Sequence, residues 1–190
     1  PSAPRPDWVA QWPGFRKGGT GAVTEAATPI DAAKLAWAHK AKVPSDWSKY
    51  TSDPIVVNGN VYVAVADELV ILDAATGATK ATARMATSID SIARMAYADG
   101  IIVVPLHGGR LQAFTADTLT CVWATDELSP IGGASQQSLS TLTIADGHVY
   151  LGTTNGKGNP ETGVGESGWL CCVSLADGAV LWSRCNQDAG

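Results

Sequence analysis

Two adjacent cysteines, Cys171 and Cys172, are the residues whose types and spacing most directly suggest chemistry in this sequence. Neighbouring thiols can close a disulfide or carry redox chemistry, and Cys121 and Cys185 bring the cysteine count to an even 4. The spacing does not choose among the possible pairings. Free thiols buried as small hydrophobic side chains are the competing interpretation.

The histidines and serines add no catalytic pattern. His39, His107 and His148 are far apart and lack the spacing of metal ligands, so they are expected in solvated turns and strand ends. No strained nucleophile elbow is visible around any serine. The sequence therefore predicts no catalytic residue and no metal site.

The composition indicates a folded domain that does not bind nucleic acid. Hydrophobic residues make up 45% of the chain and charged residues 16%, which is typical of a compact core. The net charge of −5 argues against a phosphate-backbone partner, because such binding requires clustered Lys and Arg. No apolar run reaches the length of a membrane span. The opening "PSAPRP" is typical of a linker left after a leader or anchor is removed, which favours an exported protein.

The chain contains an internal repeat, which locates the elements that must position these residues. Three segments of eleven residues align without gaps, and each follows a second shared pattern that contains a turn glycine. The turn glycines Gly59, Gly100 and Gly147 are 41 and 47 residues apart, which is the period of propeller blades. The aligned segments are 71–81, 113–123 and 172–182, and the upstream patterns are 56–65, 96–105 and 143–152.

Each repeat is predicted to be a four-stranded antiparallel meander. Asn58-Gly59, Asp99-Gly100 and Asp146-Gly147 are dipeptides that close tight hairpins. Gly77 and Gly178 close the hairpin between the third and fourth strands, and Thr118-Leu119 replaces this glycine in the middle repeat, so that turn is expected to differ. A tryptophan recurs in the fourth strand, with Ala81 as the exception. The residues expected to maintain the repeat are Trp37, Gly59, Asp73, Gly77, Gly100, Trp123, Gly147, Gly178 and Trp182.

The pattern A-x-D-x-x-T-G-K-x-x-W resembles the tryptophan-docking repeat of the pyrroloquinoline quinone β-propellers. It is present here as Ile71, Asp73, Thr76 and Gly77, with Ala81 in the last position. The opening "WPGFRKGGTGAVTEAATP" also resembles the segment that leads into such propellers. This family contains both quinoprotein alcohol dehydrogenases and a non-catalytic scaffold of outer-membrane barrel assembly, so the resemblance implies the architecture and leaves the activity open.

The fold class is therefore an all-β, partial β-propeller of about three four-stranded blades plus one strand. Because the family has seven or eight blades, the missing ones are expected from the parent chain or from a second chain. Residues 1–28 are expected to form a linker and lead-in segment, and residues 29–190 the partial propeller. The expected blades are 51–88, 89–127 and 134–187, and the resemblance implies that a strand at 30–40 completes the closing blade.

The resemblance also bears on the cysteine pair. In quinoprotein dehydrogenases a disulfide between adjacent cysteines lies against the quinone, and calcium and an aspartate base complete the site. Cys171 and Cys172 instead align with Val70-Ile71 and Gln112-Ala113, inside a strand where successive side chains point to opposite faces. No cofactor is therefore predicted, and pyrroloquinoline quinone with calcium is expected only if the chain is a dehydrogenase fragment.

An insertion in the third repeat is the candidate binding region. From the turn glycine to the leucine that begins the third strand there are 10, 11 and 23 residues in the three repeats. The extra segment, 155–167, is expected to lie beside 126–138 on one face of the propeller, with a surface loop without function as the competing interpretation. The candidate ligand-binding residues are Asn155, Asn159, Glu161, Glu166, Gln136 and Gln137.

The leading hypothesis is a non-catalytic, exported or cell-surface propeller that binds a protein, peptide or glycan through this loop face. An extracellular, cell-surface or periplasmic location is expected. The alternatives are a fragment of a quinoprotein dehydrogenase and a purely structural propeller segment of a larger envelope protein.

Overall fold

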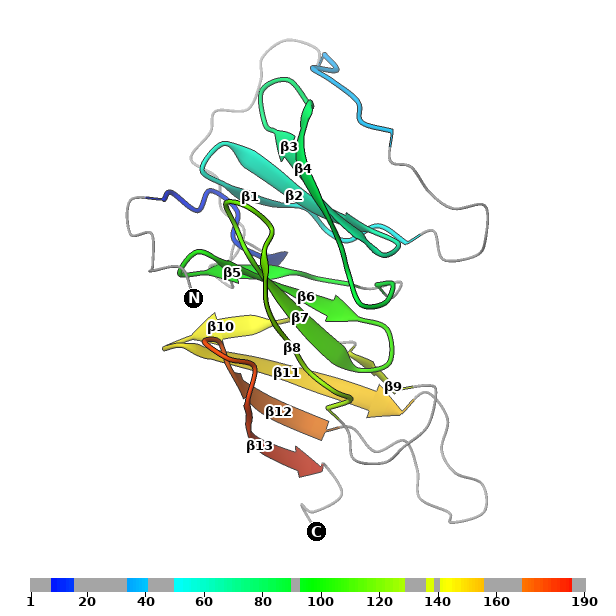
Figure 1. Cartoon of the computed structure of the whole chain (residues 1–190), viewed down its shortest axis with the longest axis vertical. Coiled ribbons are helices and arrows are strands. Elements are labelled where there is room, and N and C mark those ends of the chain that lie inside the picture. Colours follow the sequence, from blue (N-terminus) through cyan, green and yellow to red (C-terminus); the bar gives the residue numbers. More distant parts are fainter. Residues whose placement is uncertain are drawn as a thin grey trace.

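The computed structural model describes residues 8–15, 34–40, 50–89, 93–128, 136–138, 141–155 and 169–185. These residues form three antiparallel sheets and contain no helix, which confirms the predicted fold class of a partial propeller (Figure 1). Blade 1 contains β1 (Ile55–Val57), β2 (Asn60–Val65), β3 (Glu68–Asp73) and β4 (Thr79–Arg84). Blade 2 contains β5 (Ala96–Ala98), β6 (Ile101–Leu106), β7 (Arg110–Thr115) and β8 (Cys121–Ala124). Blade 3 contains β10 (Thr143–Ala145), β11 (His148–Asn155), β12 (Trp169–Ser174) and β13 (Val180–Cys185), and β9 (Gln136–Ser138) also pairs with β11.

Each blade begins with the predicted tight hairpin. Asn58 and Gly59, between β1 and β2, have φ angles of 50° and 70°. Both central residues of such a turn need positive φ, which asparagine tolerates and glycine adopts freely. The same pair of angles recurs at Asp99 and Asp146 with the glycines that follow them. The local sequence therefore sets the register of the first two strands in every blade.

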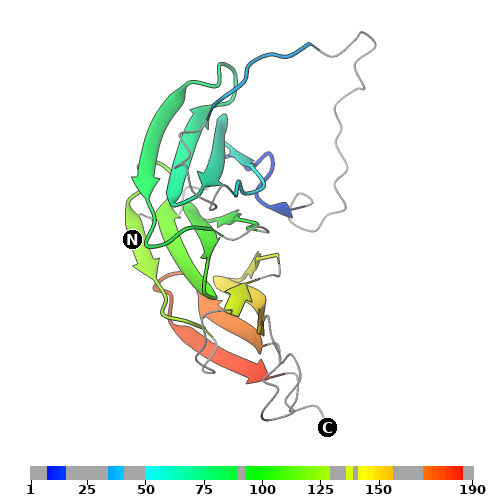
Figure 2. The same ribbon diagram turned by 90° about the vertical axis from the view of Figure 1, so that its right-hand side faces the viewer.

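The three blades stack face to face along a curved arc (Figure 2). One hydrophobic cluster, which includes Tyr62, Leu69, Ile102 and Phe114, fills the space between blades 1 and 2. A second cluster, which includes Val103, Leu111, Val149 and Cys171, fills the space between blades 2 and 3. Each sheet is therefore covered by its neighbours, and this explains why alternation of apolar and polar residues is weak in the sequence.

The pairing between the third and fourth strands shifts register at the same place in every blade. The irregularity falls between Ile71 and Leu72 in blade 1, between Ala113 and Phe114 in blade 2, and between Cys172 and Val173 in blade 3. A β-bulge increases the local twist of a strand. The outer strand of each blade is thus twisted relative to the inner three.

Residues 8–15 run along the first strands of blades 1 and 2. Trp12 and Val56 exchange two backbone hydrogen bonds of 2.8 Å, and the Pro13 carbonyl accepts one from the Tyr97 amide. The Arg94 guanidinium lies 3.9 Å from the centre of the Phe15 ring and 3.3 Å from an Asp53 carboxylate oxygen. The lead-in segment therefore joins the two blades. Within the part of the chain that is described, no helix has the length and apolar character needed to cross a membrane.

Candidate functional site

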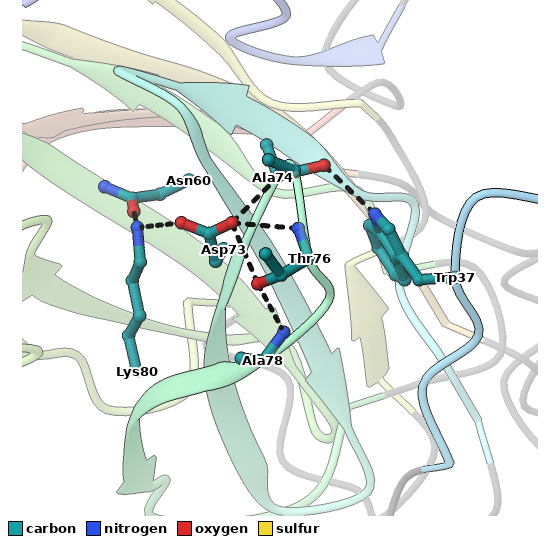
Figure 3. Close-up of polar contacts among 8 residues, drawn as sticks. Trp37, Asn60, Asp73, Ala74, Thr76, Ala78 and Lys80 are labelled. Atoms are coloured by element: carbon teal, nitrogen blue, oxygen red, sulfur yellow. Dashed lines mark hydrogen bonds and ion pairs between the residues drawn. The ribbon is translucent and has the colours of Figure 1, made fainter.

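Two tryptophans connect neighbouring elements through the turn between the third and fourth strands of a blade. The Trp37 indole nitrogen donates to the Ala74 carbonyl at 3.0 Å (Figure 3). The Trp37 ring also covers Gly77. In the same way the Trp123 indole donates to the Leu175 carbonyl of blade 3 at 2.8 Å, and its ring covers Gly178. We call each such carbonyl and glycine a tryptophan socket. A Cβ on Gly77 or Gly178 would lie 2.6 or 2.7 Å from ring carbons, so the socket requires glycine.

The contact between blades 1 and 2 is built from different residues at the same positions. Ala81 stands where the tryptophan is expected, and the Tyr62 hydroxyl donates to the Ala116 carbonyl at 2.7 Å, in place of an indole. Leu119 stands where the glycine is expected and is 4% exposed. The tyrosine and the leucine together fill the volume that an indole ring fills elsewhere.

The expectation that the turn at Thr118-Leu119 would differ is wrong. Leu119 adopts φ 54°, and its amide donates to the Thr115 carbonyl at 3.0 Å, as Gly178 does to Ser174. A left-handed conformation costs an L-residue about 1–2 kcal/mol. Burial of the leucine side chain in the first cluster offsets this cost, so the turn keeps the common backbone.

Polar groups fix the turn of blade 1. One Asp73 carboxylate oxygen accepts hydrogen bonds from the Ala75 and Thr76 amides and from the Thr76 hydroxyl, and the other forms a 2.8 Å ion pair with Lys80 (Figure 3). The hydrogen bond from Lys80 and those from Thr76 lower the pKa of the Asp73 carboxyl to about 2. Asp73 is therefore an element of the turn and remains ionised over the physiological pH range.

The adjacent cysteines do not fit a quinone-binding disulfide. Cys171 and Cys172 lie in the part of β12 that pairs in regular register with β11, opposite Leu151 and Tyr150, and both are free thiols. Cys171 faces blade 2 within the second cluster, and burial raises the pKa of its thiol. Consecutive strand residues point to opposite faces, so the two sulfur atoms cannot both meet one side of a planar cofactor. No chemical step through a quinone is therefore derived for this chain.

The loop face is formed by the turns between the second and third strands and by the ends of β9 and β11. In blade 1 the Met85 amide donates to the Asp67 carbonyl, and in blade 2 the Leu128 amide donates to the Gly109 carbonyl. In blades 1 and 2 the residues that follow the fourth strand thus pack over the short turn between the second and third strands. In blade 3, β9 instead pairs with the last residues of β11, in the order Ser138 to Thr153 and Gln136 to Asn155.

This pairing brings together part of the predicted binding region. Gln136 and Asn155 are backbone partners, and Gln137 is the partner of Thr154. The last residues of segment 126–138 and the first residue of segment 155–167 therefore lie on adjacent strands of one sheet. Asn159, Glu161 and Glu166 lie outside the described residues.

Sequence reasoning missed two buried donors at the base of the insertion. Thr153 and Trp169 are direct partners across β11 and β12, and the Thr153 hydroxyl and the Trp169 indole nitrogen are buried without a hydrogen-bond partner. Thr153 is 4% exposed. An unpaired buried donor costs about 1–3 kcal/mol, so this pair needs an acceptor. The repeat alignment could have indicated this site, because the polar Thr153 stands where blades 1 and 2 have the apolar Val65 and Leu106.

The histidines do not form a cluster. His39 lines a hollow beside blade 1, and the His148 ring lies 6.2 Å from that of Tyr150 at the open side of blade 3. Among the described residues, no group of three or more histidine, cysteine or acidic side chains is arranged to hold a metal ion.

The three stacked meanders, joined by sockets that recur at one position of the repeat, define a propeller of the pyrroloquinoline quinone-like type. A model of the family described as outer membrane protein assembly factor BamB matches residues 24–188. The chain therefore belongs to this family of PQQ-like β-propellers.

Two solved dehydrogenase structures share the fold at low identity. The quinohemoprotein alcohol dehydrogenase ADHIIG of Pseudomonas putida matches with a TM-score of 0.60 and 19% identity, over 74% of this chain and 21% of that enzyme. The quinohemoprotein alcohol dehydrogenase of Comamonas testosteroni matches with a TM-score of 0.55 and 22% identity, over 70% and 20% of the two chains. BamB of Moraxella catarrhalis matches with a TM-score of 0.48 and 18% identity, over 66% of this chain and 34% of that protein. The chain thus spans about a fifth of the length of either dehydrogenase. A search of curated protein sequences found no match.

Proposed function

We propose that this chain is a non-catalytic binding or scaffold segment of an exported or cell-surface propeller, and that its loop face contacts a protein partner. The observation that carries the proposal is the pair of unpartnered donors, Thr153 and Trp169, beside the strand pairing of β9 with β11. A rigid sheet that ends in long polar segments is the arrangement that proteins commonly use to present binding residues. Membership in a family described as an assembly factor supports a protein partner and an exported location.

The donors suggest how a partner would be held. A hydroxyl and an indole nitrogen on neighbouring strands can donate to one carbonyl group or to two acceptors on a peptide. The donors stand on β11 and β12, whose six-residue ladder fixes their backbone, so little ordering is required when the acceptor arrives. Glycans also offer acceptors, and the experiment below includes them as a contrary outcome.

The experiment compares binding and stability in the same variants. An array of synthetic peptides and glycans is probed with the labelled wild-type chain, with Thr153→Val and with a chain shortened across residues 156–167. We expect the wild type to bind a subset of the peptides and both variants to lose them. Thr153→Val should be at least as stable as the wild type in urea, because it removes an unpaired buried hydroxyl without changing the side chain's shape.

The matched control is Thr143→Val, at an exposed position of the neighbouring strand β10, where it pairs with Tyr150 of β11. It should leave both binding and stability unchanged. Equal binding by Thr153→Val and the wild type would contradict the proposal. So would the absence of any bound peptide, or binding of glycans alone.

A fragment of a quinoprotein dehydrogenase is the second hypothesis, because two such enzymes share this fold. The cysteine pair argues against a quinone on this part of the chain. Titration with pyrroloquinoline quinone and calcium, followed by absorbance, separates the two hypotheses. A saturable spectral change would favour the dehydrogenase.

A further inference from the structure

The two unpartnered donors of blade 3 face the space between blades 2 and 3, which we call the seam. They stand on β11 and β12, which are neighbours in this blade (Figure 1). Thr153 and Trp169 are direct partners across these strands. The next pair on the same face of the sheet is Leu151 with Cys171. Leu151 and Cys171 belong to the second cluster, and Trp169 packs against it, so both donors border the seam.

The polar character of this position is particular to blade 3. Thr153 is 4% exposed and stands where blades 1 and 2 place Val65 and Leu106, which are also buried. Apolar side chains therefore complete the packing at the equivalent place in those blades. In blade 3 the Thr153 hydroxyl and the Trp169 indole nitrogen are closed to water and have no hydrogen-bond partner. A polar group that pairs with them removes the cost of burying them unpaired, which favours its binding.

The hydrogen-bonding types of the two groups restrict the group that can pair with them. An indole nitrogen only donates, whereas a hydroxyl both donates and accepts. A primary amide matches this pair, because its oxygen can accept from Trp169 and its nitrogen can donate to Thr153. An ammonium or guanidinium group has no acceptor to offer the indole.

Charge separates the amide from a carboxylate. Burial of a carboxylate in an apolar seam is costly unless a cation accompanies it. On the blade 2 side the seam includes Leu128, which follows Asp126 and Glu127 in the chain. Arg110 is paired with Glu127 at 3.3 Å. The Cys171 thiol is neutral, since burial raises its pKa. The described surroundings of the donors therefore favour an uncharged ligand.

We infer that Thr153 and Trp169 select the side-chain amide of a glutamine or asparagine in the partner peptide. This inference rests on the proposed function and adds the chemistry of the group that anchors the partner. Both donor atoms are closed to water, so an incoming group reaches them only when neighbouring side chains move. A single side chain needs a smaller opening than a main-chain segment does. This difference favours a side-chain amide over a backbone carbonyl.

The test begins with the peptides that the wild-type chain retains on the array. Each glutamine or asparagine in them is replaced singly by the corresponding acid, or by methionine or leucine as the apolar side chain of similar size. Fluorescence anisotropy gives the dissociation constants. We expect one position at which both replacements weaken binding at least about tenfold, because they bury a charge or leave a buried donor unpaired.

Thr153→Val and Trp169→Phe should each narrow the difference between the amide peptide and its apolar counterpart. This ratio is measured within one variant, so it does not depend on the fraction of that variant that is folded. Thr143→Val, at an exposed position of β10, is the matched control and should keep the full preference for the amide.

The contrary outcomes separate this inference from the proposed function. Retained peptides that lack glutamine and asparagine, or that bind equally well after both replacements, would overturn the inference alone and point to a backbone carbonyl or water at the donors. Tighter binding of the acid peptide would overturn it as well. If the wild-type chain retains no peptide, the proposed function and this inference both fail.

Discussion

Replacement of Gly178 by alanine should destabilise the chain far more than its position in a surface turn suggests. Gly178 has φ 76°, and an added Cβ would lie 2.7 Å from the Trp123 ring. The left-handed conformation costs alanine about 1–2 kcal/mol. Displacement of the ring breaks its 2.8 Å hydrogen bond to the Leu175 carbonyl, for about another 1 kcal/mol. Exposure of roughly 40 Å² of indole surface adds about 1 kcal/mol, so the total is about 3–4 kcal/mol.

Gly147→Ala in the same blade isolates the contribution of the socket. Gly147 has nearly the same φ of 73°, but nothing lies within 4 Å of an added Cβ. Only the conformational cost of about 1–2 kcal/mol should remain. Urea unfolding of both variants, monitored by circular dichroism, gives the two free energies of unfolding. Equal losses would refute the reasoning, because they would mean that the Trp123 ring and its hydrogen bond contribute nothing measurable.

Three further predictions concern the other polar and apolar positions of the repeat. Ala81→Trp and Leu119→Gly should each destabilise the chain, whereas the double variant should be at least about 1 kcal/mol more stable than the sum of the two effects in a urea double-mutant cycle. Burial raises the pKa of the Tyr62 hydroxyl to about 12, so ultraviolet titration should show one of the 4 tyrosines ionising late, and Tyr62→Phe should remove that step. The Asp73 pKa of about 2 lies below its ordinary 3.8, so its stabilising effect is complete above about pH 4 and is lost as the pH falls towards 2; Asp73→Asn should flatten the stability profile only in that window.

The parts of the fold that depend on residues close together in the sequence were predictable. Asn58-Gly59 and its equivalents at Asp99 and Asp146 adopt positive φ at both positions, and such dipeptides between two β-rich runs indicate a tight hairpin. Alignment with Val70-Ile71 predicted that Cys171 and Cys172 lie in a strand with their side chains on opposite faces. The pairing of β12 with β11 agrees with this prediction. Alignment of the chain with itself was therefore sufficient for the blades and for the strand that carries the cysteines.

Contacts between blades were not predictable in the same way. Tyr62 donates to a carbonyl 54 residues away, and its role in replacing an indole is visible only when two blades are stacked. The turn at Leu119 was mispredicted for the same reason, because the burial that offsets its strained backbone comes from blade 1. The donors Thr153 and Trp169 have ordinary side chains, and only burial without a partner makes them notable.

The bulge that recurs between the third and fourth strands has a consequence for solubility. A strand at the border of a sheet is a template on which other molecules can add, and this architecture multiplies such borders with every repeat. Because β4, β8 and β13 are each kinked at the same position, none offers a long flat edge for a foreign strand. Lys80 and Arg84 add charge along β4. Because the bulge recurs with the repeat, each added blade brings an outer strand that is already interrupted. The number of blades can therefore increase without adding a long flat edge strand that promotes aggregation.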